Sequence, residues 1–310
     1  MHDKLNISLL ISEPMKTINY RLKTRTLYLE TLFAFFLIVL FMISCSKDAD
    51  KKLSSSNTLN YIYVENCPEI NIEFDQANKT VEFLIPYKSS LSIQKVKLHL
   101  DFSENATSNI DPDKEYDLTS PLIINIIAED KTIATYTLNS KKCEGGKSAL
   151  LVCDIQKGWL PVFRDASFFL NSNIVIDKAF DAKVPIYYIM AASLKGSPSW
   201  DLPEILHYYE NGKIIDKNDN NSFANTTLHK ELILNGISKV YVIGLASMGC
   251  ILSTCKGGAL LKYDLTLVSD AHDEPTSYWE FTEQDIDKCN QIVNDSGIGK
   301  LVLANDLEFK

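Results

Sequence analysis

The chain has 310 residues, of which 45% are hydrophobic and 23% charged, so it is long enough to form two domains with hydrophobic cores of their own. The formal net charge is −9 at pH 7, and no stretch combines basic side chains with interleaved aromatic residues. Because phosphate backbones attract basic surfaces, this charge argues against a nucleic-acid partner.

Residues 1–44 predict a signal peptide. Four basic side chains between Lys16 and Arg25 precede an apolar run at residues 32–43, and the small residue Ser44 follows. This order is typical of secretion signals, and the run is shorter than the ~20 apolar residues of a transmembrane helix. An uncleaved N-terminal anchor is the alternative, and Met15 is open as the true start.

Cys45 directly follows Ser44, a placement that resembles the lipobox of bacterial lipoproteins. The resemblance implies a lipid on Cys45 and an extracytoplasmic protein anchored to a bacterial membrane, with the outer membrane favoured and surface exposure open. Residues 45–58 are rich in Ser, Lys and Asp and predict a flexible tether. Their acidic start is similar to the export tags of Bacteroidetes surface lipoproteins.

Residues 59–142 show a hydrophobic period of two, which predicts half-buried antiparallel strands. The clearest segments are 69–74, 80–85, 95–102 and the hairpin 125–138. About six strands would form a small β-sandwich. The turn Asp117-Leu-Thr-Ser-Pro121 and the strand Tyr136-Thr-Leu138 resemble the short immunoglobulin-like modules of Bacteroidetes surface lipoproteins. The resemblance implies a spacer or a binding module, with the spacer preferred.

Residues 148–310 alternate apolar runs with amphipathic stretches. The runs are 149–154, 185–190, 213–216, 240–244, 265–269 and 300–304. Apolar strands separated by helices predict a six-stranded, mainly parallel sheet in a three-layer α/β/α Rossmann-like domain. Since such sheets carry their chemistry beyond the carboxyl ends of the strands, Asp154, Lys217 and Cys250 are expected at one edge.

The stretch 241–254 predicts a strand, a tight turn and a helix with Cys250 in its first turn. Small residues between Gly244 and Gly249 leave room for a ligand, and a helix start offers unpaired N–H groups and a positive dipole end. Both features lower a thiol pKa and favour an oxyanion, so the stretch indicates a nucleophile. Taken alone, a single cysteine in such a stretch favours a structural role, because cysteine is a common small core residue.

Three motifs in this segment resemble those of the isochorismatase-like cysteine hydrolases, which include nicotinamidases and N-carbamoylsarcosine amidohydrolases. They are Ala149-Leu-Leu-Val-Cys-Asp-Ile-Gln-Lys-Gly-Trp159, Lys217-Asn-Asp-Asn-Asn-Ser-Phe-Ala-Asn-Thr-Thr-Leu228, and residues 236–254 followed by Asp270-Ala271. The resemblance implies a catalytic triad of Asp154, Lys217 and Cys250, in which the carboxylate takes the thiol proton. It also implies a cis peptide at Ala246 and Ser247, which with the Cys250 N–H forms the oxyanion hole.

From this resemblance we expect a lipid-anchored hydrolase that cleaves C–N bonds of a small amide or carbamoyl substrate through a thioester. Trp159, Trp200 and Phe223 are the expected apolar walls of the substrate pocket. The alternative is a catalytically inactive binding or structural surface lipoprotein. A homo-oligomer formed through the α/β domain is open.

No metal and no other cofactor is expected. Nicotinamidases bind a metal through an Asp-x-His pair and a further histidine, whereas residues 189–200 contain no histidine. His207 and His229 are expected in helices, as surface or packing residues.

The remaining cysteines predict structural roles. Cys67 and Cys143 could form a disulfide in an oxidising compartment, although spacing in sequence does not decide this. Cys153, Cys255 and Cys289 are expected to be buried.

Overall fold

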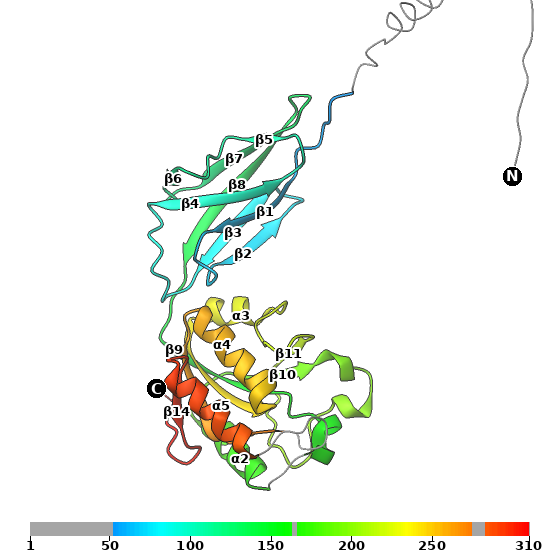
Figure 1. Cartoon of the computed structure of the whole chain (residues 1–310), viewed down its shortest axis with the longest axis vertical. Helices are drawn as coiled ribbons and strands as arrows, with labels where there is room; N and C mark the ends of the chain where they lie inside the picture. The colour runs from blue at the N-terminus through cyan, green and yellow to red at the C-terminus, as the bar shows by residue number, and fades with distance from the viewer. Residues whose placement is uncertain (1–51, 163–165, 275–282, 310) are drawn as a thin grey trace, which may run out of the picture. The chain divides into compact units, whose positions relative to one another are not determined.

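The computed structural model describes residues 52–162, 166–274 and 283–309 (Figure 1). The predicted signal peptide, Cys45 and the first part of the predicted tether lie outside these ranges. None of the described helices is long and apolar enough to cross a membrane.

Residues 59–142 form two β-sheets around a common hydrophobic core. One sheet has the strand order β1-β4-β6 and the other β2-β3-β8-β7-β5. The strands are β1 (Leu59–Val64), β2 (Asn71–Asp75), β3 (Thr80–Ile85), β4 (Val96–Phe102), β5 (Thr107–Ser108), β6 (Glu115–Tyr116), β7 (Leu122–Ile127) and β8 (Ile133–Lys142). Side chains of both sheets, such as Ile62 and Phe83, meet in one core cluster.

The predicted hairpin is confirmed, because β7 and β8 pair antiparallel on either side of a turn at Asp130. Two expectations for this region were wrong. The region contains eight strands rather than about six, since β5 and β6 have only two residues each. In addition, β3 and β8 pair in parallel, because the chain between them passes through the other sheet before it returns.

The predicted six-stranded parallel sheet is confirmed in the C-terminal part of the chain. Its order is β11-β10-β9-β12-β13-β14, and every neighbouring pair is parallel. The strands are β9 (Lys147–Cys153), β10 (Ile186–Ala191), β11 (Lys213–Lys217), β12 (Ile237–Leu245), β13 (Asp264–Asp273) and β14 (Lys300–Val302). Almost every residue of β9 and β12 is buried, as a sheet covered on both faces requires.

Helices cover both faces of this sheet (Figure 1). The helix α2 (Ala166–Asp181) packs on one face together with the chain end near Leu307. Helices α3 (Leu228–Leu234), α4 (Leu252–Leu260) and α5 (Glu283–Asp295) pack on the other face. The short helical turns are η1 (Lys157–Val162), η2 (Ala192–Leu194), η3 (Pro198–Trp200) and the π-helical turn η4 (Ser247–Ile251).

The strand order reverses between β9 and β12. From β9 the chain adds β10 and β11 on one side, and from β12 it adds β13 and β14 on the other. In open parallel sheets the crevice at such a switch point, beyond the carboxyl ends of the strands, is where ligands bind.

The described cysteines are free thiols, so no disulfide joins Cys67 and Cys143. The prediction that Cys153, Cys255 and Cys289 are buried is confirmed, because all three are fully shielded from solvent.

Candidate active site

Asp154 and Cys250 come together because the two central strands approach closely at their carboxyl ends. Gly244 of β12 lies beside Cys153 of β9, with a φ of +124°. A Cβ on Gly244 would lie 2.0 Å from the Cys153 carbonyl oxygen, so only glycine fits there. Asp154 follows with a φ of 56°, which is uncommon for a non-glycine residue but is tolerated by aspartate more often than by most others.

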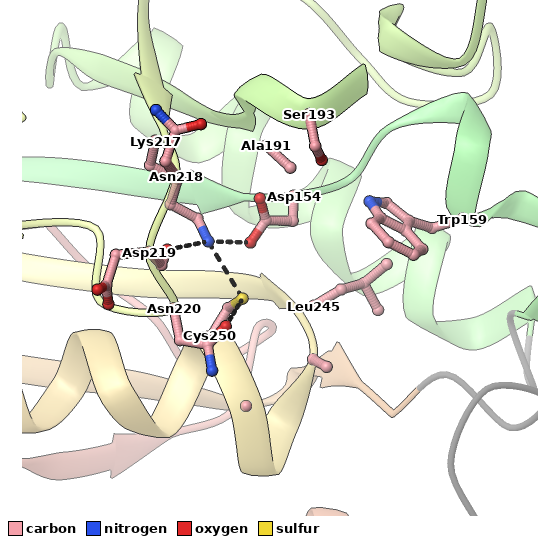
Figure 2. Close-up of a pocket in the computed structure, with 12 residues that line it drawn as sticks. Asp154, Trp159, Ala191, Ser193, Lys217, Asn218, Asp219, Asn220, Leu245 and Cys250 are labelled. Carbon is pink, nitrogen blue, oxygen red and sulfur yellow. Dashed lines mark hydrogen bonds and ion pairs between the residues drawn. The ribbon is translucent and has the colours of Figure 1, made fainter. Parts of the chain in front are cut away.

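Lys217 joins the two residues at the end of β11. Its ammonium lies 2.9 Å from Asp154 Oδ2 and donates to Cys250 Sγ at 3.1 Å and to the Asp219 carbonyl at 2.9 Å (Figure 2). Asp154 and Lys217 are each only 4% exposed. The three residues that were predicted to share one edge of the sheet therefore converge on a single point.

The Asp154 carboxylate retains capacity to accept a proton. Among the described residues, neither of its oxygens accepts a hydrogen bond of normal geometry, so the contact with Lys217 is an ion pair rather than a directional hydrogen bond. Burial raises the pKa of Asp154, and the charge of Lys217 lowers it in part. Burial lowers the pKa of Lys217, but Asp154 and Cys250 more than offset this, so it stays above its ordinary value.

The thiol of Cys250 is not a preformed thiolate. Burial, followed by the charge of Asp154, raises its pKa to about 11, although Lys217 lowers it. The expectation of a lowered pKa for the Cys250 thiol was therefore wrong. The helix start and one ammonium do not outweigh the loss of solvent, so the proton must leave during the reaction.

A cavity of about 370 Å³ opens onto these three residues (Figure 2). One part of its wall is apolar and includes Trp159, Ala191 and Leu245. Another part is polar and consists of Ser193 together with the consecutive side chains of residues 218–220. The cavity is large enough for a small molecule.

Of the three expected pocket walls, Trp159 lines this cavity, whereas Trp200 and Phe223 are not among its described lining residues. Phe223 turns into the core, where it is 8% exposed and stacks on Tyr263. Trp200 packs behind the wall, where its carbonyl accepts a hydrogen bond from Gln156 Nε2 at 3.2 Å.

Gln156 fixes the wall formed by residues 191–200. It is fully buried, and its Oε1 accepts the Ala191 N–H at 2.8 Å. The motif that contains Gln156 was recognised from the sequence, but this bracing role was missed because it depends on contacts with residues 35 and 44 positions away.

Hydrogen bonds stabilise the turn that carries Cys250, and they come from side chains that were not predicted as site residues. His272 Nδ1 bonds Ser247 Oγ at 2.8 Å, and the carboxylate of the buried Glu274 accepts the Met248 N–H at 2.9 Å. Cys289 donates to the Ser247 carbonyl at 3.2 Å. The side chain of Ser247 therefore faces away from the cavity. Its proximity to Asp270-Ala271 in a motif was the only available signal for His272.

The cis peptide bond joins Leu245 and Ala246, one position earlier than the resemblance implied. Ala246 and Cys250 both line the cavity, whereas Ser247 does not. Of the predicted oxyanion-hole residues, these two are therefore placed beside the site.

Among the described residues, no group of three or more His, Cys, Asp or Glu side chains could hold a metal ion. His229 lies in α3 as expected and is buried against the Tyr263 hydroxyl. His207, contrary to expectation, lies outside any helix, at the surface beside Asp177.

The buried Asp154 and Lys217 and the partly exposed Cys250, which meet at the switch point of a parallel sheet, define a candidate site for nucleophilic hydrolysis. Comparison with known proteins is consistent with this class, because residues 148–296 match the family model described as the isochorismatase domain. The match is confined to the α/β region of the chain.

Individual proteins are similar to part of this chain. The chain is 27% identical over 140 residues to the uncharacterized isochorismatase family protein YrdC of Bacillus subtilis (strain 168), a match that covers 40% of this chain and 73% of that protein. A cysteine hydrolase from Pseudomonas syringae pv. phaseolicola has a TM-score of 0.46 and 18% identity, covering 51% of this chain and 89% of that one. The pyrazinamidase of Pyrococcus horikoshii in complex with zinc has a TM-score of 0.44 and 20% identity, covering 51% and 99%.

Proposed function

We propose that residues 148–310 form a cysteine hydrolase that cleaves the C–N bond of a small amide or carbamoyl compound through a thioester. The observation that carries the proposal is the convergence of Asp154, Lys217 and Cys250 at one cavity, with the lysine nitrogen 2.9 Å and 3.1 Å from the other two. A nucleophile, a base and an orienting cation within hydrogen-bond reach are the parts that acyl transfer requires.

In the proposed reaction, the Asp154 carboxylate takes the thiol proton as Sγ of Cys250 attacks the carbonyl carbon. The backbone N–H groups of Ala246 and Cys250 bind the developing oxyanion. Asp154 then returns the proton to the departing ammonia or amine, and a thioester forms. Water, deprotonated by Asp154, attacks the thioester, and the thiol is regenerated with that proton. Lys217 holds the carboxylate and sulfur in register and stabilises the thiolate.

Ammonia release from a panel of primary amides and carbamoyl compounds tests this reaction. Cys250→Ser should lower the rate on any accepted compound by at least about a thousandfold, because a serine hydroxyl is a much weaker nucleophile beside this base. Cys67→Ser is the control, since this thiol belongs to the β-sheet region and should not affect the rate. Turnover that survives Cys250→Ser would refute the proposal.

A second candidate is a binding or structural protein that has lost turnover. The observation that favours it is the raised pKa of Cys250, because a protonated thiol is inert without a productive base. Incubation with the amide panel followed by mass spectrometry separates the two functions. A thioester adduct on Cys250 supports the enzyme, whereas binding without adduct or ammonia supports the second candidate.

The proposed location is extracytoplasmic, with a lipid on Cys45 and the immunoglobulin-like β-sheet region as a spacer between the membrane and the hydrolase. The basic and apolar segments before Cys45 support this proposal. Labelled fatty acid fed to expressing bacteria should be incorporated into the protein, and Cys45→Ser should abolish the incorporation. Equal labelling of both proteins would contradict it.

A further inference from the structure

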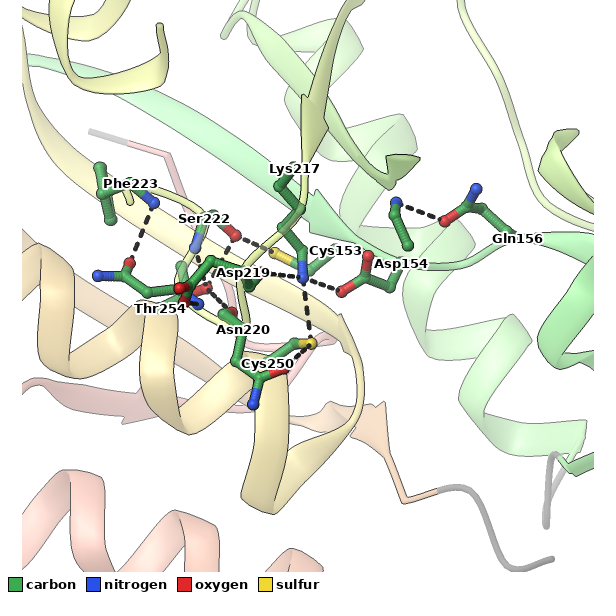
Figure 3. Close-up of polar contacts among 12 residues, drawn as sticks. Cys153, Asp154, Gln156, Lys217, Asp219, Asn220, Ser222, Phe223, Cys250 and Thr254 are labelled. Carbon is green, nitrogen blue, oxygen red and sulfur yellow. Dashed lines mark hydrogen bonds and ion pairs between the residues drawn. The ribbon is translucent and has the colours of Figure 1, made fainter. Parts of the chain in front are cut away.

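Asn220 lies beside the sulfur of Cys250. It belongs to the motif Lys217–Leu228, but the sequence analysis gave it no role. Its carboxamide Oδ1 is 3.7 Å from Sγ and accepts the thiol hydrogen. Figures 2 and 3 show it on the side of the sulfur away from Asp154. The sulfur therefore has a polar neighbour in addition to Asp154 and Lys217.

Buried contacts fix the position of Asn220 even though its own side chain is exposed at the mouth of the cavity. Thr254 Oγ1 accepts the Ser222 N–H at 3.1 Å and lies 3.5 Å from the Asn220 carbonyl, to which its hydroxyl can donate (Figure 3). The hydroxyls of Ser222 and Thr254 are also 2.8 Å apart, and both residues are fully buried. Because Thr254 belongs to α4, these hydrogen bonds join the loop to the helix that follows the nucleophile.

A carboxamide can serve the sulfur in both of its protonation states. Its oxygen accepts from the thiol, and after rotation its nitrogen donates to the thiolate. Among the described residues, Asn220 Nδ2 has no hydrogen-bond partner, so this donor is available. We propose that Asn220 is a further catalytic residue that stabilises the Cys250 thiolate by donating from Nδ2. The inference rests on the proposed function, because that thiolate forms only if Cys250 is the nucleophile.

The Cys250 thiolate needs a stabilising group in addition to Lys217. Burial and Asp154 both oppose the thiolate, and Lys217 offsets them only in part. Lys217 is also shared among Cys250, Asp154 and the Asp219 carbonyl. A neutral donor from the opposite side stabilises the anion without competing for Lys217.

Alkylation of Cys250 by iodoacetamide between pH 7 and pH 9 tests the inference without any substrate. Below the thiol pKa, the rate at one pH falls about tenfold for each unit by which the pKa rises. Asn220→Leu, which keeps the branching at Cγ and the number of side-chain heavy atoms, should slow alkylation about fivefold because one hydrogen bond to the anion is lost. Asn220→Asp should slow it by more than about tenfold, since a carboxylate then faces the sulfur.

Two controls complete the experiment. Asn211→Asp adds the same charge at an exposed position outside the cavity and should leave the rate unchanged. Methyl methanethiosulfonate, a reagent of different shape, should show the same ratios if the thiolate population has changed. Unchanged rates in both Asn220 variants, or an effect confined to one reagent, would overturn the inference. A wild-type protein that releases no ammonia would instead count against the proposed function and leave this comparison intact.

Discussion

Asp154 and Lys217 act on the thiol of Cys250 in opposite directions, since the first raises its pKa and the second lowers it. Asp154→Asn should therefore speed the alkylation of Cys250 at pH 8 by about tenfold, because the thiolate fraction rises as the thiol pKa falls. The same variant should abolish hydrolysis, since the proton acceptor is lost. Lys217→Met should slow alkylation by a similar factor. Initial rates of carboxamidomethylation by mass spectrometry measure both effects.

Cys289 is the internal reference for this comparison. It is fully buried, and burial raises its pKa to about 12, so it should stay unmodified in every folded variant. A substitution that merely loosens the domain would expose both thiols together. If both variants changed the rate at Cys250 in the same direction, the assignment of opposing charges would be wrong.

At the scale of elements, the site depends on the close approach of β9 and β12. Gly244→Ala should lower the free energy of unfolding by at least ~3 kcal/mol, because its Cβ would lie 2.0 Å from the Cys153 carbonyl oxygen. Gly297→Ala is the matched control. Gly297 also has a positive φ, of 66°, but a Cβ added there would meet no atom of a non-adjacent residue within 4 Å, so we expect a loss of only ~1 kcal/mol from backbone strain. Urea unfolding followed by fluorescence measures both, and equal losses would show that the clash is unimportant.

The elements of the α/β region could be predicted from the sequence because the central strands are apolar on both faces and end at polar residues. The same signal placed Asp154, Lys217 and Cys250 at one edge. Strand direction in the β-sheet region could not be predicted as well, because the parallel pair β3–β8 has the same period of two as an antiparallel pair.

The sequence also could not predict which loop side chains point into the core and which point into the cavity. Phe223 and Asn220 are three positions apart, yet the first stacks on Tyr263 in the core and the second faces the sulfur. Tertiary contacts decide between these directions, and apolar character alone favoured the wrong one. His272 was missed because β13 continues to Asp273, beyond the predicted strand 265–269.

At the scale of the whole molecule, His272 links the nucleophile turn to global stability. Burial lowers its pKa to about 4, although its contact with Asn290 raises it. In the unfolded chain histidine titrates near pH 6.5. Between this pH and about pH 4, the unfolded state therefore binds a proton at His272 that the native state does not bind. Stability from this group is therefore complete above about pH 6.5 and is lost as the pH falls toward 4, by roughly 3 kcal/mol in total. Asp154 has the opposite effect on the pH dependence of stability. Because burial raises its pKa, the native state takes up a proton at Asp154 more readily than the unfolded chain does, and this group favours folding as the pH falls.

The difference between wild type and His272→Gln isolates this contribution. Glutamine does not titrate and can still bond Ser247 or Asn290, so the variant should be less stable than wild type at pH 7 and should lose less stability between pH 6.5 and pH 4. Urea unfolding at half-unit pH steps gives the two curves. A parallel curve for His272→Gln would mean that His272 takes up a proton as readily in the folded protein as in the unfolded chain, which would contradict a lowered pKa of His272 in the native state.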